Sequence, residues 1–127
     1  MRALPYFAAA ALLLVAPASA ETAKRIEITL ANFSFTPSAI TLKAGQPVTL
    51  HFENKGSGGH DFTASQFFKT AAMDSATRTK LGKKGKVSLE GGTSMDVTLT
   101  PKAGSYKAKC SHFLHAGFGM TGTITVS

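Results

Sequence analysis

Short segments in which apolar and polar residues alternate run through most of the chain. Between residues 25 and 30, isoleucine and leucine alternate with arginine, glutamate and threonine. The same period of two recurs at 40–42, 48–53, 87–89, 95–99, 105–110 and 121–126. Such alternation is typical of strands with one buried face, and turns such as Gly91-Gly92 separate the segments. The pattern predicts an all-β fold, an antiparallel sandwich or barrel of seven to eight strands.

One internal segment, residues 65–82, lacks this alternation. It is rich in alanine, threonine and lysine, with Phe67 and Phe68 near its start. We interpret it as a short helix or an irregular excursion from the strands.

The first twenty residues have the features of a secretory signal peptide. Arg2 gives a basic start, residues 7–15 are an almost unbroken apolar run, and Ala18-Ser19-Ala20 supplies small residues for cleavage. The run is too short for a membrane anchor. We therefore expect residues 1–20 to be a signal peptide and residues 21–127 to be one periplasmic domain without stable membrane insertion.

The chain is basic, with 14 Lys and Arg residues against 7 Asp and Glu and a formal net charge of +7 at pH 7. A basic surface favours acidic proteins or anionic surfaces as partners. Nucleic acid is not expected, because an exported protein rarely meets it and the chain carries no recognition motif. Much of the excess charge is interpreted as a solvated loop containing Lys80, Lys83, Lys84 and Lys86.

Cysteine usage gives the first chemical indication. An exported protein uses cysteine mainly for disulfides, yet this chain has a single thiol, Cys110. Such a residue is a buried structural thiol, an intermolecular bridge, a nucleophile or a metal ligand.

Every second residue of a strand points to the same face, so the apolar positions predict which side chains point inward. Cys110 and Met120 fall on the apolar positions of their strands, and His60 shares a face with Phe62. Three potential metal ligands are therefore expected in the apolar interior, at strand ends.

The loop between Cys110 and Met120 adds two histidines, His112 and His115, either of which offers a further imidazole. Two imidazoles, a thiolate and a weak thioether form the donor set of electron-transfer copper sites. A structural zinc site would more often show several cysteines, and calcium or magnesium would need oxygen ligands.

The run from Cys110 through His115 and Met120 to Val126 resembles the C-terminal copper loop of cupredoxins. Its C-x4-H-x4-M spacing resembles rusticyanin and plantacyanin more than plastocyanin. Residues 35–40 and 44–48 resemble the first strands of bacterial cupredoxins, and residues 59–62 contain the position of the family's first histidine ligand.

The resemblance implies a Greek-key β-sandwich with one type 1 copper per chain. The implied ligands are His60, Cys110, His115 and Met120, and the family spacing favours His115 over His112. Met120 would be the weak axial ligand.

The sequence also departs from the family pattern. Phe113-Leu114 stand where Pro-Gly often precedes the loop histidine, and Asp61 follows the first ligand where Asn or Ser is common. A carboxylate at this position could lower the copper potential or join the two ligand loops by hydrogen bonds. His51 is expected on the surface, and Met73 and Met95 in packing positions.

The function implied is one-electron transfer in the periplasm by a monomer, with a cytochrome or an oxidase as partner. His115 would be the electron exit, and residues 116–118 an apolar docking patch assisted by lysines. A core position for Phe118 is the alternative. The alternative is a periplasmic protein of copper handling or resistance, with copper-handling proteins as partners. An enzyme is not expected, because Lys109 and Ser111 flank Cys110 where multicopper oxidases place histidines.

Overall fold

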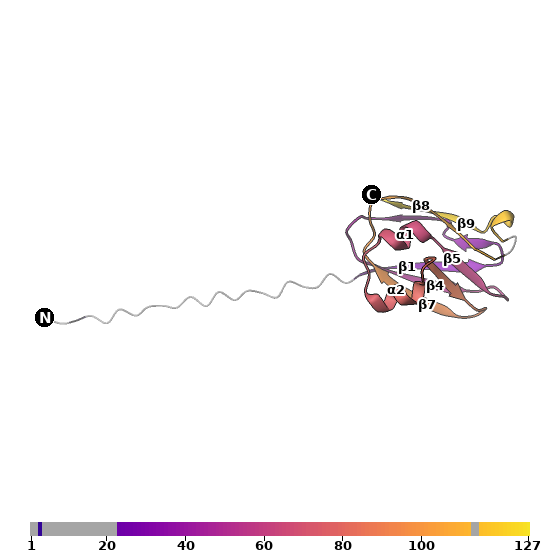
Figure 1. Ribbon diagram of the computed structural model, residues 1–127, viewed down its shortest axis with the longest axis horizontal. Helices are drawn as coiled ribbons and strands as arrows, with labels where there is room; N and C mark the ends of the chain where they lie inside the picture. The colour runs from indigo at the N-terminus through magenta and orange to yellow at the C-terminus, as the bar shows by residue number, and fades with distance from the viewer. Residues whose placement is uncertain (1–2, 4–22, 113–114) are drawn as a thin grey trace.

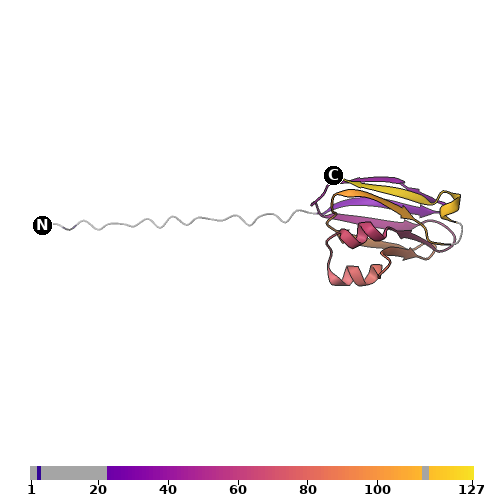
Figure 2. The ribbon, with the colours of Figure 1, turned by 45° about the horizontal axis from the view of Figure 1, so that its top comes forward.

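The structure is a computed structural model that describes Ala3 and residues 23–112 and 115–127. The signal peptide expected at residues 1–20 lies, apart from Ala3, outside the described residues. Two β-sheets pack face to face, with two short helices at one side (Figures 1 and 2). The predicted β-sandwich is confirmed.

The described part of the chain contains nine strands. One sheet has four strands in the order β2 (Ser34–Thr36), β1 (Lys24–Ala31), β4 (Val48–Asn54), β7 (Ser94–Leu99). The other has five strands in the order β3 (Ala39–Leu42), β9 (Thr121–Val126), β8 (Gly104–Lys109), β5 (His60–Thr63), β6 (Lys86–Leu89).

Two of the neighbouring pairs, β1 with β4 and β3 with β9, are parallel, whereas the other pairs are antiparallel. Alternation along the sequence predicts which face of a strand is buried, but it is the same for both pairings. The parallel pairs arise because the chain crosses between the sheets before it returns, as in a Greek key.

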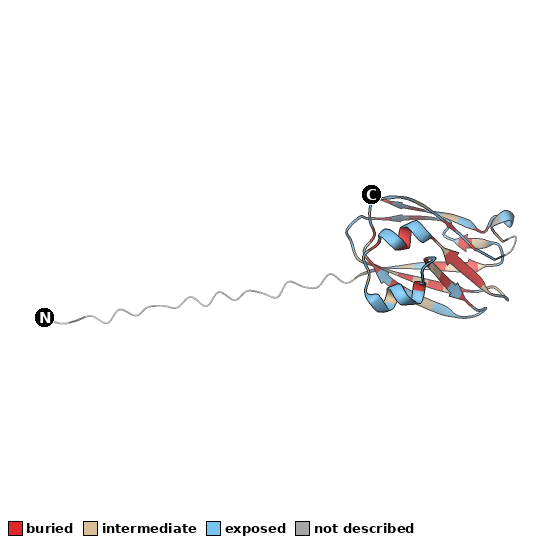
Figure 3. Ribbon diagram, viewed as in Figure 1, coloured by how far each residue is buried: buried red, intermediate tan, exposed pale blue. Residues whose placement is uncertain are grey.

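The core lies between the sheets and follows the alternation of the sequence (Figure 3). In β4 the residues Val48, Leu50, Phe52 and Asn54 are buried, while those between them are partly exposed. Phe62 of β5 joins the layers, because its ring centroid lies 5.0 Å from that of Phe52. Each fully buried side chain of this size contributes about 1.5–3 kcal/mol by leaving water.

The segment without alternation forms two helices, α1 (Ser65–Thr70) and α2 (Ser75–Leu81). Phe67 and Phe68 bury their rings in the core, which ties α1 to the sandwich. Asp74 caps α2 by accepting a hydrogen bond of 2.7 Å from the backbone N–H of Thr77. Gly82, with φ of 67°, ends the helix.

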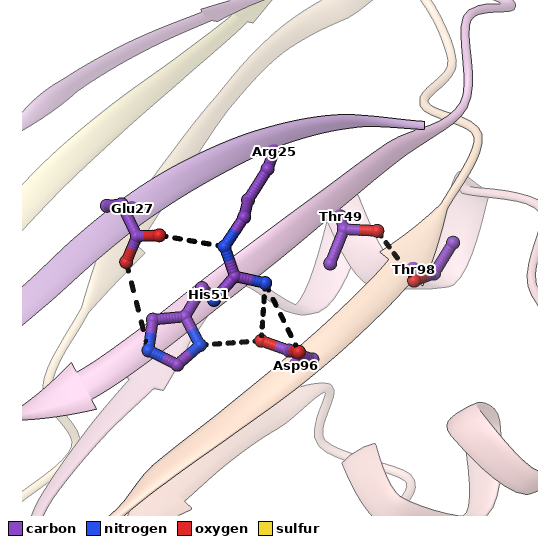
Figure 4. A network of polar contacts seen from close by, with 6 residues as sticks. All are labelled: Arg25, Glu27, Thr49, His51, Asp96 and Thr98. Carbon is purple, nitrogen blue, oxygen red and sulfur yellow. Dashed lines mark hydrogen bonds and ion pairs between the residues drawn. The ribbon is translucent and has the colours of Figure 1, made fainter. Parts of the chain in front are cut away.

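His51 lies on the outer face of the four-stranded sheet, in a network of charged residues (Figure 4). Its Nδ1 is 2.6 Å from Asp96 Oδ1, and its Nε2 is 3.8 Å from Glu27 Oε2. Arg25 donates to Glu27 at 2.8 Å and to Asp96 at 3.3 Å. The expected outward position is confirmed.

Among the described residues, no helix is long and apolar enough to cross a bilayer.

Candidate metal centre

The topology brings the predicted metal ligands to one end of the five-stranded sheet. His60 begins β5, Cys110 follows the end of β8, and Met120 precedes the start of β9. Since β8 is antiparallel to both β5 and β9, these three points lie at the same end. In Figure 1 this is the end that carries the yellow loop with the 3-10 helix η1 (Ala116–Phe118).

Three of the four predicted ligands present donor atoms to a common point. A ring nitrogen of His60, Cys110 Sγ and a ring nitrogen of His115 all lie within 4.8 Å of one another. Cys110 Sγ lies 3.3 Å from His115 Nδ1. His60 and Cys110 are only 3% and 1% exposed, whereas His115 is half-buried.

His60 is oriented by Asn32, from the turn between β1 and β2. Its Nε2 lies 3.2 Å from Asn32 Oδ1, which can only accept a hydrogen bond, so Nε2 carries the proton. The other nitrogen, Nδ1, is buried and has no hydrogen-bond partner among the described residues. A buried lone pair without a partner is costly, and a metal ion beside Cys110 would satisfy it. The donor set therefore fits a metal ion.

Met120 is completely buried, and its backbone closes the loop. The N–H of Cys110 donates to the Met120 carbonyl at 3.1 Å, and the N–H of Met120 donates to the His115 carbonyl at 3.0 Å. These bonds hold the thiol, the half-buried imidazole and the methionine together before any metal is bound.

Asp61 joins the two ligand segments. Its Oδ1 accepts hydrogen bonds from Ser111 N at 2.9 Å and Thr63 Oγ1 at 2.6 Å, and its Oδ2 accepts from Ser111 Oγ at 2.6 Å. Its own N–H points at Cys110 Sγ, 3.5 Å away. Of the two roles considered for this carboxylate, joining the loops is the one that these contacts support.

The charge states of the site suit metal binding. Burial, reinforced by the nearby His115 and His112, lowers the pKa of His60, although Asp61 opposes this. Burial by itself would raise the pKa of Asp61, but the hydrogen bonds from Ser111 and Thr63 lower it. At neutral pH His60 is therefore a neutral imidazole, the form that can bind a metal ion, and Asp61 is an anion.

The sequence over residues 4–126 matches the cupredoxin-like domain family. The chain belongs to this family. No curated protein matches the sequence.

Solved structures of similar fold include two auracyanins. Reduced auracyanin from the photosynthetic bacterium Roseiflexus castenholzii is 20% identical, with a TM-score of 0.62 over 84% of this chain and 99% of the other. Auracyanin B is 26% identical, with a TM-score of 0.59 over 85% of this chain and 92% of the other. A multicopper oxidase is 16% identical with a TM-score of 0.63, but the match covers only 39% of that longer chain and 84% of this one.

Two supporting residues of this cupredoxin are not evident from its sequence. Asn54 is fully buried, and its side chain binds the N–H of Gly56 and the carbonyls of Gly58 and Leu89, each at 2.9 Å. A Cβ on Gly56 would lie 2.8 Å from both His60 Nε2 and Asn32 Oδ1. The sequence gives only weak signals of these roles: Asn54 is a polar residue at the end of an alternating strand, and Gly56 lies in the glycine-rich loop that follows.

Two exposed aromatic residues lie next to the half-buried His115: Phe33 contacts its ring, and Phe118 contacts Phe33. Phe118 is 65% exposed and Phe33 is 47% exposed, and their centroids lie 5.3 Å apart. Phe33 also meets the ring of His115 edge-on at 5.4 Å. The sequence left Phe118 open between the surface and the core, and the structure places it on the surface. Phe33, from a turn distant in sequence, was not predicted.

The histidines are expected to separate cleanly on mutation. His60→Ala should destroy the type 1 visible spectrum of copper-loaded protein, because it removes the buried imidazole from the predicted donor set. His115→Ala should open a position that added imidazole fills, restoring the band. His51→Ala should leave the spectrum unchanged, since it lies on the other sheet. Titration with Cu(II) followed by visible absorption measures all three.

If His112→Ala destroyed the site while His115→Ala preserved it, the assignment of the loop ligand would be wrong.

Proposed function

We propose that this cupredoxin is a periplasmic one-electron carrier, with one type 1 copper bound by His60, Cys110, His115 and Met120. Two observations carry the proposal. His60 Nδ1 is buried without a hydrogen-bond partner among the described residues, and donor atoms of His60, Cys110 and His115 lie within 4.8 Å of one another. A thiolate suits Cu(I), imidazoles suit both oxidation states, and copper would supply the one-electron couple. We propose no catalytic activity for the chain.

The ligands are held by protein contacts that do not depend on the metal. Asn32 fixes the ring of His60, Asp61 fixes the segment after Cys110, and backbone hydrogen bonds fix Met120. A site held in this way moves little when the ion changes charge, which favours fast electron transfer.

The exposed rings of Phe33 and Phe118 offer a docking surface at the edge of His115, the proposed exit for the electron. Exposed aromatic residues at one point of a surface are typical of contact sites for other proteins. The proposed partner is a soluble redox protein, such as a cytochrome or an oxidase, with an acidic surface.

Lysines that lie near the metal site are the ones that can steer such a partner toward it. Lys55 follows β4 and Lys109 precedes Cys110, so both lie at the end that carries the metal site. The residues Lys80, Lys83 and Lys84 lie in or after α2, toward the opposite end of the sandwich (Figure 1). Steering is therefore assigned to Lys55 and Lys109.

Reduction by an acidic c-type cytochrome should be rapid and should slow as salt is added, because ions screen exposed charges. The double variant Lys55→Ala, Lys109→Ala should react about threefold to tenfold more slowly at low salt and show a weaker salt dependence. The matched control Lys83→Ala, Lys84→Ala should behave as the wild type does. Stopped-flow absorption at several ionic strengths measures all three proteins, with an unchanged copper spectrum as the check on the site.

Slow reduction by every acidic partner tried, together with copper sensitivity of a deletion strain, would favour copper handling over electron transfer. Equal effects of the two double variants would contradict the assignment of steering to the metal end.

A further inference from the structure

We infer that Asp61, Cys110 and His112 form a second, transient metal site through which copper reaches the permanent one. The inference rests on the copper function proposed above. The donor atoms of these three residues lie within 4.8 Å of one another, and Cys110 belongs equally to the set formed with His60 and His115. Two donor sets thus share one sulfur atom, and they differ in how far they are open to solvent.

Of the three donor residues in this second set, His112 is the most exposed to solvent. Its side chain is 46% exposed, whereas the permanent ligand His60 is only 3% exposed. Its ring lies over Gly59, where a Cβ would be 3.4 Å from His112 Cε1. It also stacks on the ring of His115, with centroids 5.3 Å apart and planes inclined by 14°. His112 therefore lies beside the permanent site, on its solvent side.

Asp61 supplies the negative charge of this second set. His112 Nε2 lies 3.6 Å from Asp61 Oδ2, which is too far for a hydrogen bond. The two atoms therefore do not occupy each other's lone pairs. The carboxylate is 1% exposed and is held by Ser111 and Thr63, which fixes its position. An ion pair with a half-exposed histidine contributes little to stability, so a purely structural role would leave His112 almost without effect.

The shared sulfur gives copper a path without complete release. A hydrated ion must lose its waters one at a time, and an exposed imidazole beside a carboxylate can replace the first of them. Cys110 would release its proton to solvent when it binds the ion, and its thiolate would remain bound throughout. His115 and His60 then replace His112 and Asp61. The net change is the exchange of two donors for two others, with no change in oxidation state.

Copper-loading kinetics test the inference directly. Apo wild type and His112→Gln are mixed with buffered Cu(II), and the rise of the thiolate-to-copper band is followed by stopped flow; release is followed with excess chelator. A residue that acts only on the path alters the rates of loading and release by the same factor. We therefore expect both rates to be about tenfold slower in His112→Gln, with unchanged copper affinity and final spectrum. The control His51→Gln, on the outer face of the other sheet, should load like the wild type.

An unchanged loading rate in His112→Gln would overturn the inference, and so would a loss of affinity with an unchanged loading rate. Neither result would touch the proposed copper function. That function would fail instead if the wild type itself developed no thiolate band.

The transient site can also be isolated. The double variant His60→Ala, His115→Ala keeps Asp61, Cys110 and His112, and it should bind Co(II) with a thiolate absorption band. Adding His112→Gln should abolish this band. A folded double variant that binds no Co(II), or a triple variant that binds it equally well, would contradict the second site. Far-UV circular dichroism checks the fold, and the loading kinetics remain decisive if the double variant does not fold.

Discussion

The Cys110→Ser variant should lose the intense visible absorption of the copper-loaded protein completely. The band arises from charge transfer between a thiolate and Cu(II), and Cys110 is the only cysteine in the chain. A serine hydroxyl is similar in size but is a poor copper ligand, so the charge transfer has no source. Titration of apo protein with one equivalent of Cu(II), followed by visible absorption, measures the loss.

The fold of this variant should persist, which separates loss of the ligand from loss of the protein. Cys110 is 1% exposed, and its sulfur faces the N–H of Asp61 and the ring of His115, both of which a hydroxyl can contact. Burying the hydroxyl costs about 1–2 kcal/mol when it finds such partners. Unchanged far-UV circular dichroism with no visible band is the expected pair of results. A variant that keeps the band would show that the thiolate of Cys110 is not its source.

The alternation of side chains between the two faces of each strand carries most of the information on the candidate site. Because side chains alternate between the two faces of a strand, the apolar neighbours of Cys110 and Met120 predict that both point inward, and both are buried. The same reasoning applies to His60, which is buried beside Phe62. The spacing of Cys110, His115 and Met120 could be predicted as a loop, and the backbone hydrogen bonds that close this loop agree.

The partner residues that orient these side chains could not be predicted, because they lie in segments that are distant in the chain. For Asp61 the sequence suggested a role in joining the two loops, but not the residue that it binds. Asn32 reaches His60 across 28 positions, and Asp61 reaches Ser111 across 50. Phe33 joins the patch around His115 through a turn in which its own φ is 62°. No local pattern in the sequence specifies such pairs; they follow from the order of strands in the two sheets.

The spatial distribution of charge illustrates the same limit. Composition predicts a basic protein and the sequence groups its lysines in residues 80–86, but neither indicates that this group lies toward the end of the sandwich opposite His115. The two lysines that lie near the site, Lys55 and Lys109, are separate in sequence and carry no motif. Their relevance follows only from the direction of β4 and β8.

Removal of the Asp61 carboxylate should destabilise the apo protein more than removal of any exposed acidic side chain. Asp61→Ala should lower the free energy of unfolding by about 3 kcal/mol, because it leaves the Ser111 N–H and two hydroxyl groups without their charged acceptor. Asp96→Asn is the matched control, since Asp96 is also an ion-pair partner but has a 53% exposed side chain. Its loss should cost about 1 kcal/mol or less. Urea unfolding at pH 7 measures both values.

The pH dependence should identify the charge of Asp61 as the source of the effect. The hydrogen bonds from Ser111 and Thr63 hold the pKa of Asp61 below its ordinary value of 3.8 in the folded protein. A lowered pKa means that the unfolded chain binds the proton more readily, so the stabilisation is complete above pH values near 3.8 and is lost as pH falls through the folded-state pKa. The difference in free energy of unfolding between wild type and Asp61→Asn should therefore be constant near neutrality and shrink in acid. A difference that stayed the same throughout the acid range would show that the shape of the side chain, and not its charge, joins the two ligand loops.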